Sequence, residues 1–236
     1  MKILFFDTET TGLIPCKGKN IHFHNLDKWP HIVQFSYLIF NTETYTIEKI
    51  VNEIIRVPSH VTISDECIAI HSVTNEMSKQ ATHCFTDILH QFMDDLNKVN
   101  QLVAHNIEFD RNVCLAEILR IVMTEDMTET EIDKYETYTE KLIFMTDFCT
   151  MKHSVDLCRI QFPRSFKSEG IRFKFPKLVE LHETLFKTIP NKAHDALIDI
   201  YICLRCYCKM EQNTDLYIVN DLFKVQWDTL FAVSTH

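Results

Sequence analysis

The spacing of apolar residues changes along the chain, and this change limits the fold more than any other feature. Three runs rich in β-branched and aromatic residues predict strands, at residues 2–6, 32–40 and 47–57. A polar turn at 41–44 separates the second run from the third, which favours antiparallel pairing. From Phe85 to Leu96 the apolar residues recur at helical spacing instead. Strands followed by alternating helices and short strands are typical of a layered α/β domain.

The second part of the chain contains the remaining elements. Short strands are expected at 101–104 and 142–146, and further helices at about 109–121, 176–186, 195–210 and 216–231. Thr82 is the expected N-cap of the helix at 85–96. We therefore predict a mixed five-stranded sheet, three antiparallel strands followed by two parallel ones, flanked by helices. Residues 1–212 would form this domain, and residues 213–236 a helical extension packed on it.

Composition excludes some classes of protein. With 236 residues, of which 46% are hydrophobic, the chain can bury the core of one domain. A net charge of -9 argues against a broadly basic surface for nucleic acid, but not against a nuclease whose carboxylates bind cations. Nine cysteines with no signal peptide before Lys2 indicate a reduced, intracellular protein without disulfides. No apolar run approaches the roughly 20 residues of a membrane span, so we expect a soluble cytoplasmic or nuclear protein.

The strand at 2–6 runs straight into two carboxylates, Asp7 and Glu9. Because strand side chains alternate between faces, Asp7 and Glu9 point to the same side and Thr8 to the other. Two anions held side by side raise each other's pKa unless a cation lies between them. An isolated pair of this kind is also common where a strand runs into a polar turn. The pair therefore predicts a metal site only if further acidic residues join it.

A third carboxylate, Asp110, follows the strand at 101–104 through a turn that contains His105 and Asn106. Asp110 falls in the first turn of a helix, from which it can point towards the carboxyl edge of the sheet, where the sites of α/β proteins usually lie. Taken alone, it would be read as a residue that complements the helix dipole.

His194 and Asp199 form the last acidic motif of the chain. Five residues of α-helix turn through roughly 500°, so one helix face cannot present both side chains. His194 is therefore expected in the loop before the helix. Asp195 is the natural N-cap of that helix, which places Asp199 in its first full turn.

Taken in order, these motifs resemble the DEDD superfamily of 3'-5' exonucleases, in its histidine subclass (DEDDh), with the ribonuclease H-like fold of the DNA polymerase III proofreading subunit. The similar segments run from residue 2 to about 208: Asp7 to Leu13, Ile70 to Thr74, His105 to Asp110, and Phe175 to Asp199. Ser72 stands where the family usually has glycine, which leaves the shape of that loop open. The acidic stretch at 124–141 is longer than the family's usual connection.

The resemblance implies a metal-dependent 3'-5' exonuclease that releases nucleoside 5'-monophosphates from DNA by a two-metal-ion mechanism. Two divalent ions, Mg²⁺ or Mn²⁺, suit the hard oxygen ligands that it assigns to Asp7, Glu9, Asp110 and Asp199. His194 would act as the general base. The related subclass has a tyrosine one position nearer the last aspartate, where this chain has Asp195.

The resemblance also implies a pocket for the 3'-terminal nucleotide. The residues expected to contact the substrate are Thr8, Thr10, Thr11, Gly12, Leu13, His71, His105, Asn106 and Phe109. Among them, Leu13 is placed to wedge against the terminal base, and the backbone near Thr10 and Thr11 to hold the nucleotide.

Three other stretches carry weaker signals. Residues 125–140 are strongly acidic and indicate a solvated helical insertion or loop that does not touch nucleic acid. Residues 164–177 interleave cations with phenylalanines, which suits a single-stranded nucleic acid or, equally, a surface loop whose rings pack into the core. Cys203, Cys206 and Cys208 lie on an apolar helix without an evident fourth ligand, so we expect burial and no zinc site.

The expected partner is therefore nucleic acid, through a single-stranded 3' end, with a polymerase or another replication protein as a further candidate. Two other functions stay open at this point: trimming of RNA 3' ends, and a catalytically idle module that binds nucleic acid or a polymerase. The complete set of carboxylates and the histidine argue against the idle module. The sequence does not predict the oligomeric state.

Overall fold

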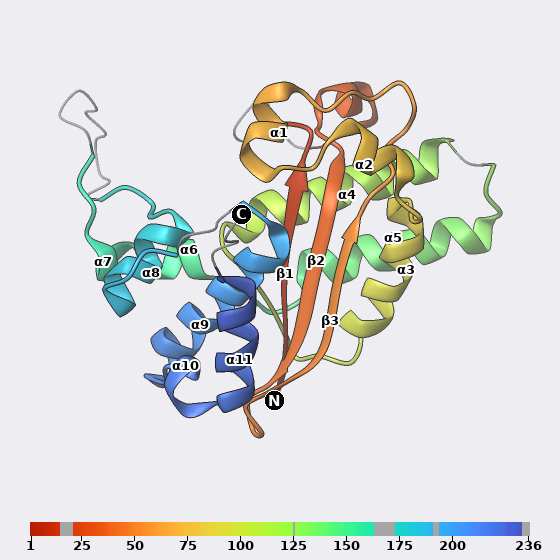
Figure 1. Cartoon of the computed structure of the whole chain (residues 1–236). Coiled ribbons are helices and arrows are strands. Elements are labelled where there is room, and N and C mark those ends of the chain that lie inside the picture. The colour runs from red at the N-terminus through yellow and green to blue at the C-terminus, as the bar shows by residue number, and fades with distance from the viewer. Residues whose placement is uncertain (15–20, 125, 163–172, 191–193, 233–236) are drawn as a thin grey trace.

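The computed structural model describes residues 1–14, 21–124, 126–162, 173–190 and 194–232 (Figure 1). A five-stranded sheet lies at the centre, in the order β3-β2-β1-β4-β5. Its antiparallel part consists of β1 (Lys2–Thr10), β2 (Ile32–Asn41) and β3 (Thr46–Ile54). Its parallel part adds β4 (Gln101–Ala104) beside β1 and β5 (Asp147–Cys149) beside β4. The predicted mixed sheet is therefore confirmed.

Helices cover both faces of the sheet (Figure 1). On one face, α3 (Phe85–Leu96) and α4 (Ile107–Thr124) pack against Leu4 and Phe6 of β1, and α5 (Glu129–Phe144) packs on α4. On the other face, α9 (Ala196–Gln212) covers Ile3 and Phe5, with α8 (Leu178–Phe186) beside it. Because β1 is buried on both sides, its first residues are continuously apolar and do not alternate with polar ones.

Short helices complete the described part of the fold. They are η1 (Phe23–Lys28), α1 (Asp65–His71), α2 (Asn75–Gln80), α6 (Thr150–His153) and α7 (Val155–Cys158). In Figure 1, α1 and α2 lie beyond the carboxyl end of β1. Within the described residues, no helix is both long enough and apolar enough to cross a membrane.

The register of β1 against β2 places polar residues beside the first acidic motif. Asp7 lies opposite Ser36, and Glu9 lies opposite Gln34. The register then shifts between Glu9 and Thr10. Residues that face each other in antiparallel strands point to the same side of the sheet, so all four of the paired side chains face α9.

Two local predictions are wrong. The N-cap of α3 is Cys84 and not Thr82, and its N–H donates to the Asp87 carboxylate at 2.9 Å. Residues 142–146, expected as a strand, largely form the last turn of α5, and β5 follows at Asp147. The apolar residue Leu142 belongs to the inward face of α5, together with Tyr135. A short apolar run is compatible with either element, and its packing decides.

The predicted final helix is divided in two, α10 (Leu216–Val219) and α11 (Asp221–Leu230), because Asn220 ends the first and caps the second. Both helices share the core of α8 and α9. Trp227 stacks on His182, with ring centres 5.5 Å apart, and Arg205 forms a two-bond ion pair with Asp215 at 2.8 and 2.9 Å. The described residues after 212 therefore pack on the same body, while the limit of the domain at 212 stays a prediction.

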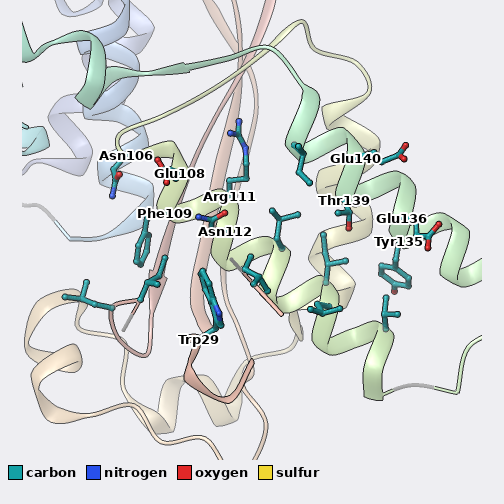
Figure 2. A pocket seen from close by; sticks show the side chains of 18 of the residues that line it. Trp29, Asn106, Glu108, Phe109, Arg111, Asn112, Tyr135, Glu136, Thr139 and Glu140 are labelled. Atoms are coloured by element: carbon teal, nitrogen blue, oxygen red, sulfur yellow. The ribbon is translucent and has the colours of Figure 1, made fainter. Parts of the chain in front are cut away.

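A groove of about 1290 Å³ runs between α4 and α5 (Figure 2). Its floor is mainly apolar, and Glu136 and Glu140 line its α5 side. Leu13, Asn106 and Phe109 line it as well. Residues 129–140 of the acidic stretch are thus helical, which is one of the two forms expected, and three of the predicted substrate contacts open into the space beside them.

We expect Arg205→Ala to lower the free energy of unfolding by about 3 kcal/mol, because it leaves the largely buried Asp215 without its partner. Urea denaturation measures the change. Glu211→Ala, at an exposed position of the same helix, is the matched control and should stay within about 0.5 kcal/mol of the wild type. An equally stable Arg205→Ala variant would contradict the view that the last helices contribute to the common core.

Candidate active site

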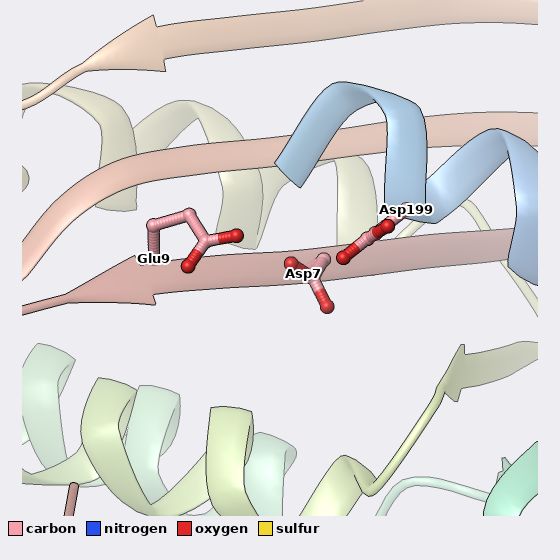
Figure 3. Close-up of side chains that lie close together, drawn as sticks. All are labelled: Asp7, Glu9 and Asp199. Carbon is pink, nitrogen blue, oxygen red and sulfur yellow. The ribbon is translucent and has the colours of Figure 1, made fainter. Parts of the chain in front are cut away.

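Three carboxylates meet at the carboxyl end of β1. Asp7 and Glu9 leave the strand on the face covered by α9, and Asp199 comes from the first turns of α9. One oxygen from each carboxylate lies within 4.8 Å of the other two. Figure 3 shows the three side chains converging from the strand and the helix. Within the described part of the chain, this is the group whose spacing would suit a metal ion.

The start of α9 is fixed by its own side chains. Asp195 is the N-cap and accepts the N–H groups of Leu197 and Ile198 at 3.0 and 3.3 Å. His194 precedes it with a φ of 66°, and its N–H donates to Oδ2 of Asp199 at 3.3 Å. The structure therefore places His194 in the loop before the helix, with an exposed side chain. The predicted order of loop, cap and first turn is observed.

Asp110 approaches the same strand end from the opposite face. It is 3% exposed, and its Oδ1 accepts the N–H of Thr8 at 3.1 Å and the Thr8 hydroxyl at 2.8 Å. Since Thr8 points towards α4, it holds Asp110 on that side, outside the group of three. Thr8, expected to contact substrate, uses both its N–H and its hydroxyl to orient a carboxylate.

Burial raises the pKa values of all four carboxyl groups, and like charge adds to this for Asp7, Glu9 and Asp199. For Asp7, burial is the main cause of a pKa well above its usual range, and the charges of Asp110 and Asp199 add to it. Burial likewise raises the pKa of Glu9 to about 8 and that of Asp199 to about 7. It raises the pKa of Asp110 to about 7 against the opposing effect of the Thr8 hydrogen bonds. A bound cation would favour the ionised forms.

The donor set fits a hard divalent cation. Oδ1 of Asp199 is shielded from solvent and has no hydrogen-bond partner among the described residues. A buried acceptor left in this state costs on the order of 1–3 kcal/mol, which coordination would remove. Carboxylate oxygens are the ligands that Mg²⁺ and Mn²⁺ prefer. Asp7, Glu9 and Asp199 are thus suited to such an ion.

The turn after β1 is ordered by backbone contacts. The Thr10 hydroxyl donates to the Gly12 carbonyl at 2.6 Å. Thr11 exchanges two hydrogen bonds with His31, each 2.9 Å long. Leu13 follows with 85% of its surface exposed, an unusual position for a large apolar side chain. The turn thus presents one apolar side chain at the mouth of the groove.

His31 connects this turn to α4. Its Nδ1 lies 3.1 Å from Oε1 of Glu117, a buried carboxylate that also accepts the N–H of Ile32 at 3.1 Å. Arg120 pairs with the same Glu117 oxygen at 3.1 Å. No local pattern predicted this cluster, because His31 and Glu117 come from distant segments of the chain.

His105, expected to contact substrate, is enclosed within the fold. Its Nε2 donates to the Pro176 carbonyl at 3.1 Å, so its Nδ1 accepts from the Thr150 hydroxyl at 3.0 Å. Burial lowers the pKa of His105 to about 4, which keeps the ring neutral. Either nitrogen would have to break an existing bond to reach a substrate.

His71 has one nitrogen in use. Its Nδ1 accepts the N–H of Val73 at 3.1 Å, so the neutral ring carries its proton on Nε2. That atom is shielded from solvent and interacts with the backbone of Thr10, which raises the pKa of His71 against the larger effect of burial. Ser72 ends α1 at a φ of 64°, a left-handed conformation that glycine adopts without steric cost. This explains why glycine is usual at that position and shows that serine also fits there.

The basic stretch lies only partly within the described residues. Arg164, Phe166, Lys167 and Arg172 fall outside them. Of the remainder, Phe175 is 50% exposed and lines the groove, while Lys174 pairs with Glu180 at 2.6 Å. The cysteines of α9, in contrast, are buried as expected, and burial raises the pKa of each thiol: Cys203, Cys206 and Cys208.

The chain belongs to the exonuclease family: the model of the family RNase_T, described as Exonuclease, matches residues 4–207. The resemblance to the DEDD superfamily and the prediction of an exonuclease are thus confirmed at the level of the family. The particular likeness to the DNA polymerase III proofreading subunit stays a prediction. No curated protein matches the chain.

Solved structures share the fold at low sequence identity. E. coli exonuclease I in complex with a dT13 oligonucleotide has a TM-score of 0.60 and 14% identity over 90% of this chain and 42% of that one. A 3'-exonuclease that recognises a histone mRNA stem-loop has a TM-score of 0.53 and 17% identity, over 91% and 64%. The nuclease domain of 3'hExo, a DEDDh family member bound to rAMP, has a TM-score of 0.51 and 18% identity, over 91% and 93%. The chain therefore spans less than two thirds of the first two proteins.

Without divalent metal, the protein is expected to lose stability as the pH rises from about 7 to 9. In the folded state the pKa of Glu9 is about 8 instead of 4.5, mainly through burial, and that of Asp7 is also raised. The native protein therefore keeps protons that the unfolded chain has already released, and the free energy of unfolding falls until the pH passes the folded-state pKa. Urea denaturation in EDTA at several pH values measures this fall.

Buried histidines act in the opposite direction, but only below about pH 6.5, where the unfolded chain protonates them. Burial lowers the pKa of these residues, which are His71, His105 and His182. Between about pH 7 and 8 the slope therefore reports on the carboxylates. Closer to pH 9 the buried thiols of α9 add to the fall, because the unfolded chain releases their protons first. Glu9→Gln should show a smaller fall than the wild type, and Mg²⁺ should reduce the fall in the wild type. A wild-type stability that rises across this range would be incompatible with the buried acidic group.

Proposed function

We propose that the protein is a metal-dependent 3'-5' exonuclease that hydrolyses DNA from its 3' end and releases nucleoside 5'-monophosphates. The observation that carries this proposal is the meeting of Asp7, Glu9 and Asp199 at the end of the central strand. Membership of the exonuclease family supports it. Asp110, held just across the strand end, is the fourth carboxylate that two metal ions require.

Asp7 would contact both divalent ions, Glu9 and Asp199 would complete one site, and Asp110 would contribute to the other. When bound, the two ions supply an activated water, neutralise the phosphate and stabilise the leaving oxygen. Burial suits the four carboxyl groups to this role. Their raised pKa values mean that the ionised forms are unfavourable without a counter-charge, and bound cations would supply that charge. Mg²⁺ and Mn²⁺ are the ions that best match oxygen-only ligands.

His194 would be the general base. Its side chain is exposed, while its backbone is tied to Asp199, so the ring stays close to the acidic group without being enclosed. Histidine is the side chain best suited to accept a proton near neutral pH. The ring would take a proton from the attacking water, whose oxygen bonds to phosphorus. The 3' oxygen of the preceding nucleotide then leaves and takes a proton from solvent, which yields a shortened strand and a 5'-monophosphate.

The turn after β1 would hold the 3'-terminal nucleotide. Its backbone near Thr10 and Thr11 is fixed, and the exposed Leu13 would wedge against the terminal base. Phe109 and Asn106 line the adjoining groove, and Nε2 of the buried His71, near the backbone of Thr10, is a further candidate donor. Glu9 would also receive the 3' hydroxyl. The structural contacts of Thr8 and His105 favour a positioning role for these two residues.

RNA trimming is a second candidate function. The fold shared with a 3'-exonuclease that recognises a histone mRNA stem-loop favours RNA as the substrate. The fold shared with exonuclease I in complex with a dT13 oligonucleotide favours DNA. A nucleic-acid partner with a single-stranded 3' end is common to both candidates. A polymerase or another replication partner, and a catalytically idle module, stay predictions from sequence.

Asp7→Asn and His194→Ala should each lower kcat by about a hundredfold or more while the protein stays folded, because one loses a metal ligand and the other the base. Shortening of a 5'-labelled strand from its 3' end measures the rate. Asp94→Asn on the exposed side of α3 and His60→Ala in the exposed segment after β3 are the matched controls. Substantial activity in Asp7→Asn would exclude the two-metal assignment.

A panel of 5'-labelled substrates separates the candidate functions. Single-stranded DNA, duplex DNA, a mismatched primer and RNA are each incubated with protein and Mg²⁺. We expect a ladder that shortens from the 3' end, and fastest on single-stranded DNA. Faster shortening of RNA would favour the second candidate. No cleavage of any substrate with Mg²⁺ or Mn²⁺ would favour the idle module.

A further inference from the structure

Gln34 is a buried polar residue near the start of β2, between the apolar residues Val33 and Phe35. Its side chain is only 2% exposed, and it lies directly opposite Glu9 in the sheet. It therefore points to the face that α9 covers, beside the candidate metal ligands. A buried amide costs free energy unless its donors and acceptor are satisfied, so its contacts deserve a functional explanation.

The amide of Gln34 joins the start of α9 to the sheet. Its oxygen accepts the N–H of Ala196, the first residue of α9, at 3.3 Å. Its nitrogen donates to Oδ1 of Asn52 on β3 at 2.9 Å, and to Oδ1 of the N-cap Asp195 at 3.5 Å. One side chain thus links the cap and first residue of a helix to the edge strand.

Asn52 is itself held in place. Its Oδ1 accepts a second hydrogen bond, from the Ser36 hydroxyl at 2.6 Å. Ser36 is fully buried and lies opposite Asp7, as Gln34 lies opposite Glu9. A polar row on β2, ending at Asn52 on β3, therefore runs beside the two acidic residues of β1.

The contacts of Gln34 lie at the end of α9 that carries Asp199. Asp199 follows Asp195 by one helical turn, and its N–H donates to the Asp195 carbonyl at 2.9 Å. Asp7 and Glu9 on β1 repel Asp199 at this end of the helix. Farther along α9, Ile202 and Tyr207 pack in the core. The apolar core holds the body of α9, and Gln34 holds its first turn.

We propose that Gln34 is a positioning residue that keeps Asp199 at ligand distance from Asp7 and Glu9 and thereby sets the affinity for divalent metal. This inference rests on the proposed function, because the metal-binding role of the three carboxylates belongs to that proposal. Within the described residues, Gln34 makes no hydrogen bond to any of the three carboxylates and acts through Asp195 and Ala196.

The test compares Gln34→Met with Gln101→Met in the full chain. Gln101, on β4, also hydrogen-bonds α9, but through the Tyr207 hydroxyl at 2.9 Å, near the other end of the helix. Both variants keep the length of the side chain and lose a contact to α9, and only Gln34→Met loosens the first turn. Mn²⁺ affinity is measured from the EPR signal of free Mn²⁺, and thermal unfolding is recorded for both.

We expect Gln34→Met to weaken Mn²⁺ binding by about tenfold or more, as is typical when a group that orients a metal ligand is removed. Gln101→Met should bind Mn²⁺ like the wild type, even where its melting temperature falls by the same amount. In activity assays, Gln34→Met should need more Mn²⁺ for half-maximal rate and recover most of its kcat at saturating metal. Loss of a purely structural residue would not raise the Mn²⁺ requirement while kcat at saturating Mn²⁺ is retained.

Wild-type Mn²⁺ affinity in Gln34→Met, with binding lost in Asp7→Asn, would overturn this inference and leave the proposed function intact. Wild-type affinity in Asp7→Asn would instead overturn the proposed function. If Gln34→Met does not fold, Asn52→Ala gives the same decision, because Asn52 is exposed and its loss frees the Gln34 amide. A severalfold weaker Mn²⁺ affinity is expected there, and unchanged affinity would overturn the inference.

Discussion

The structure depends on holding several carboxylates together in a place from which solvent is largely excluded. Burial and mutual repulsion both raise the pKa of Asp7, which stands among the others. Such a group forms only if the rest of the molecule enforces it. The fold does so by burying β1 on both faces, between α4 and α9, and each of these helices contributes one further carboxylate. The two layers of helices are therefore both part of the site.

Because side chains alternate along β1, its polar residues contact carboxylates on both faces of the sheet. Asp7 and Glu9 face α9 and meet Asp199 directly. Thr8, between them in sequence, faces α4 and fixes Asp110 through its N–H and its hydroxyl. A strand with period two can thus connect two helices that never meet on the same face. All three residues of the motif Asp7-Thr8-Glu9 therefore help to arrange the carboxylates.

Local patterns predicted much of this arrangement, and tertiary contacts decided the rest. Helix geometry was enough to place His194 in the loop before α9, because the argument needs only residue spacing. The run at 142–146 was misassigned, since packing of α5 on α4 determines its conformation. Two contacts could not be predicted, because they join residues more than 100 positions apart in the sequence. These are the hydrogen bond from Thr8 to Oδ1 of Asp110 and the hydrogen bond from Ala196 to Gln34. A glutamine within an apolar strand was the available signal for the latter.

The shift of register after Glu9 has a consequence for how such a site can change. Up to Glu9 the backbone is paired in register with β2, and as far as Phe5 it is also paired with β4, so the carboxylates follow directly from the rigid part of the sheet. From Thr10 onward the chain leaves that frame and is steadied by His31 and its contact with α4. Under the proposed function, the residues that bind metal lie before this point of the backbone and the residues that hold the 3' end lie after it. Substitutions after Thr10 would then change which strand end is accepted and leave the arrangement of the carboxylates intact.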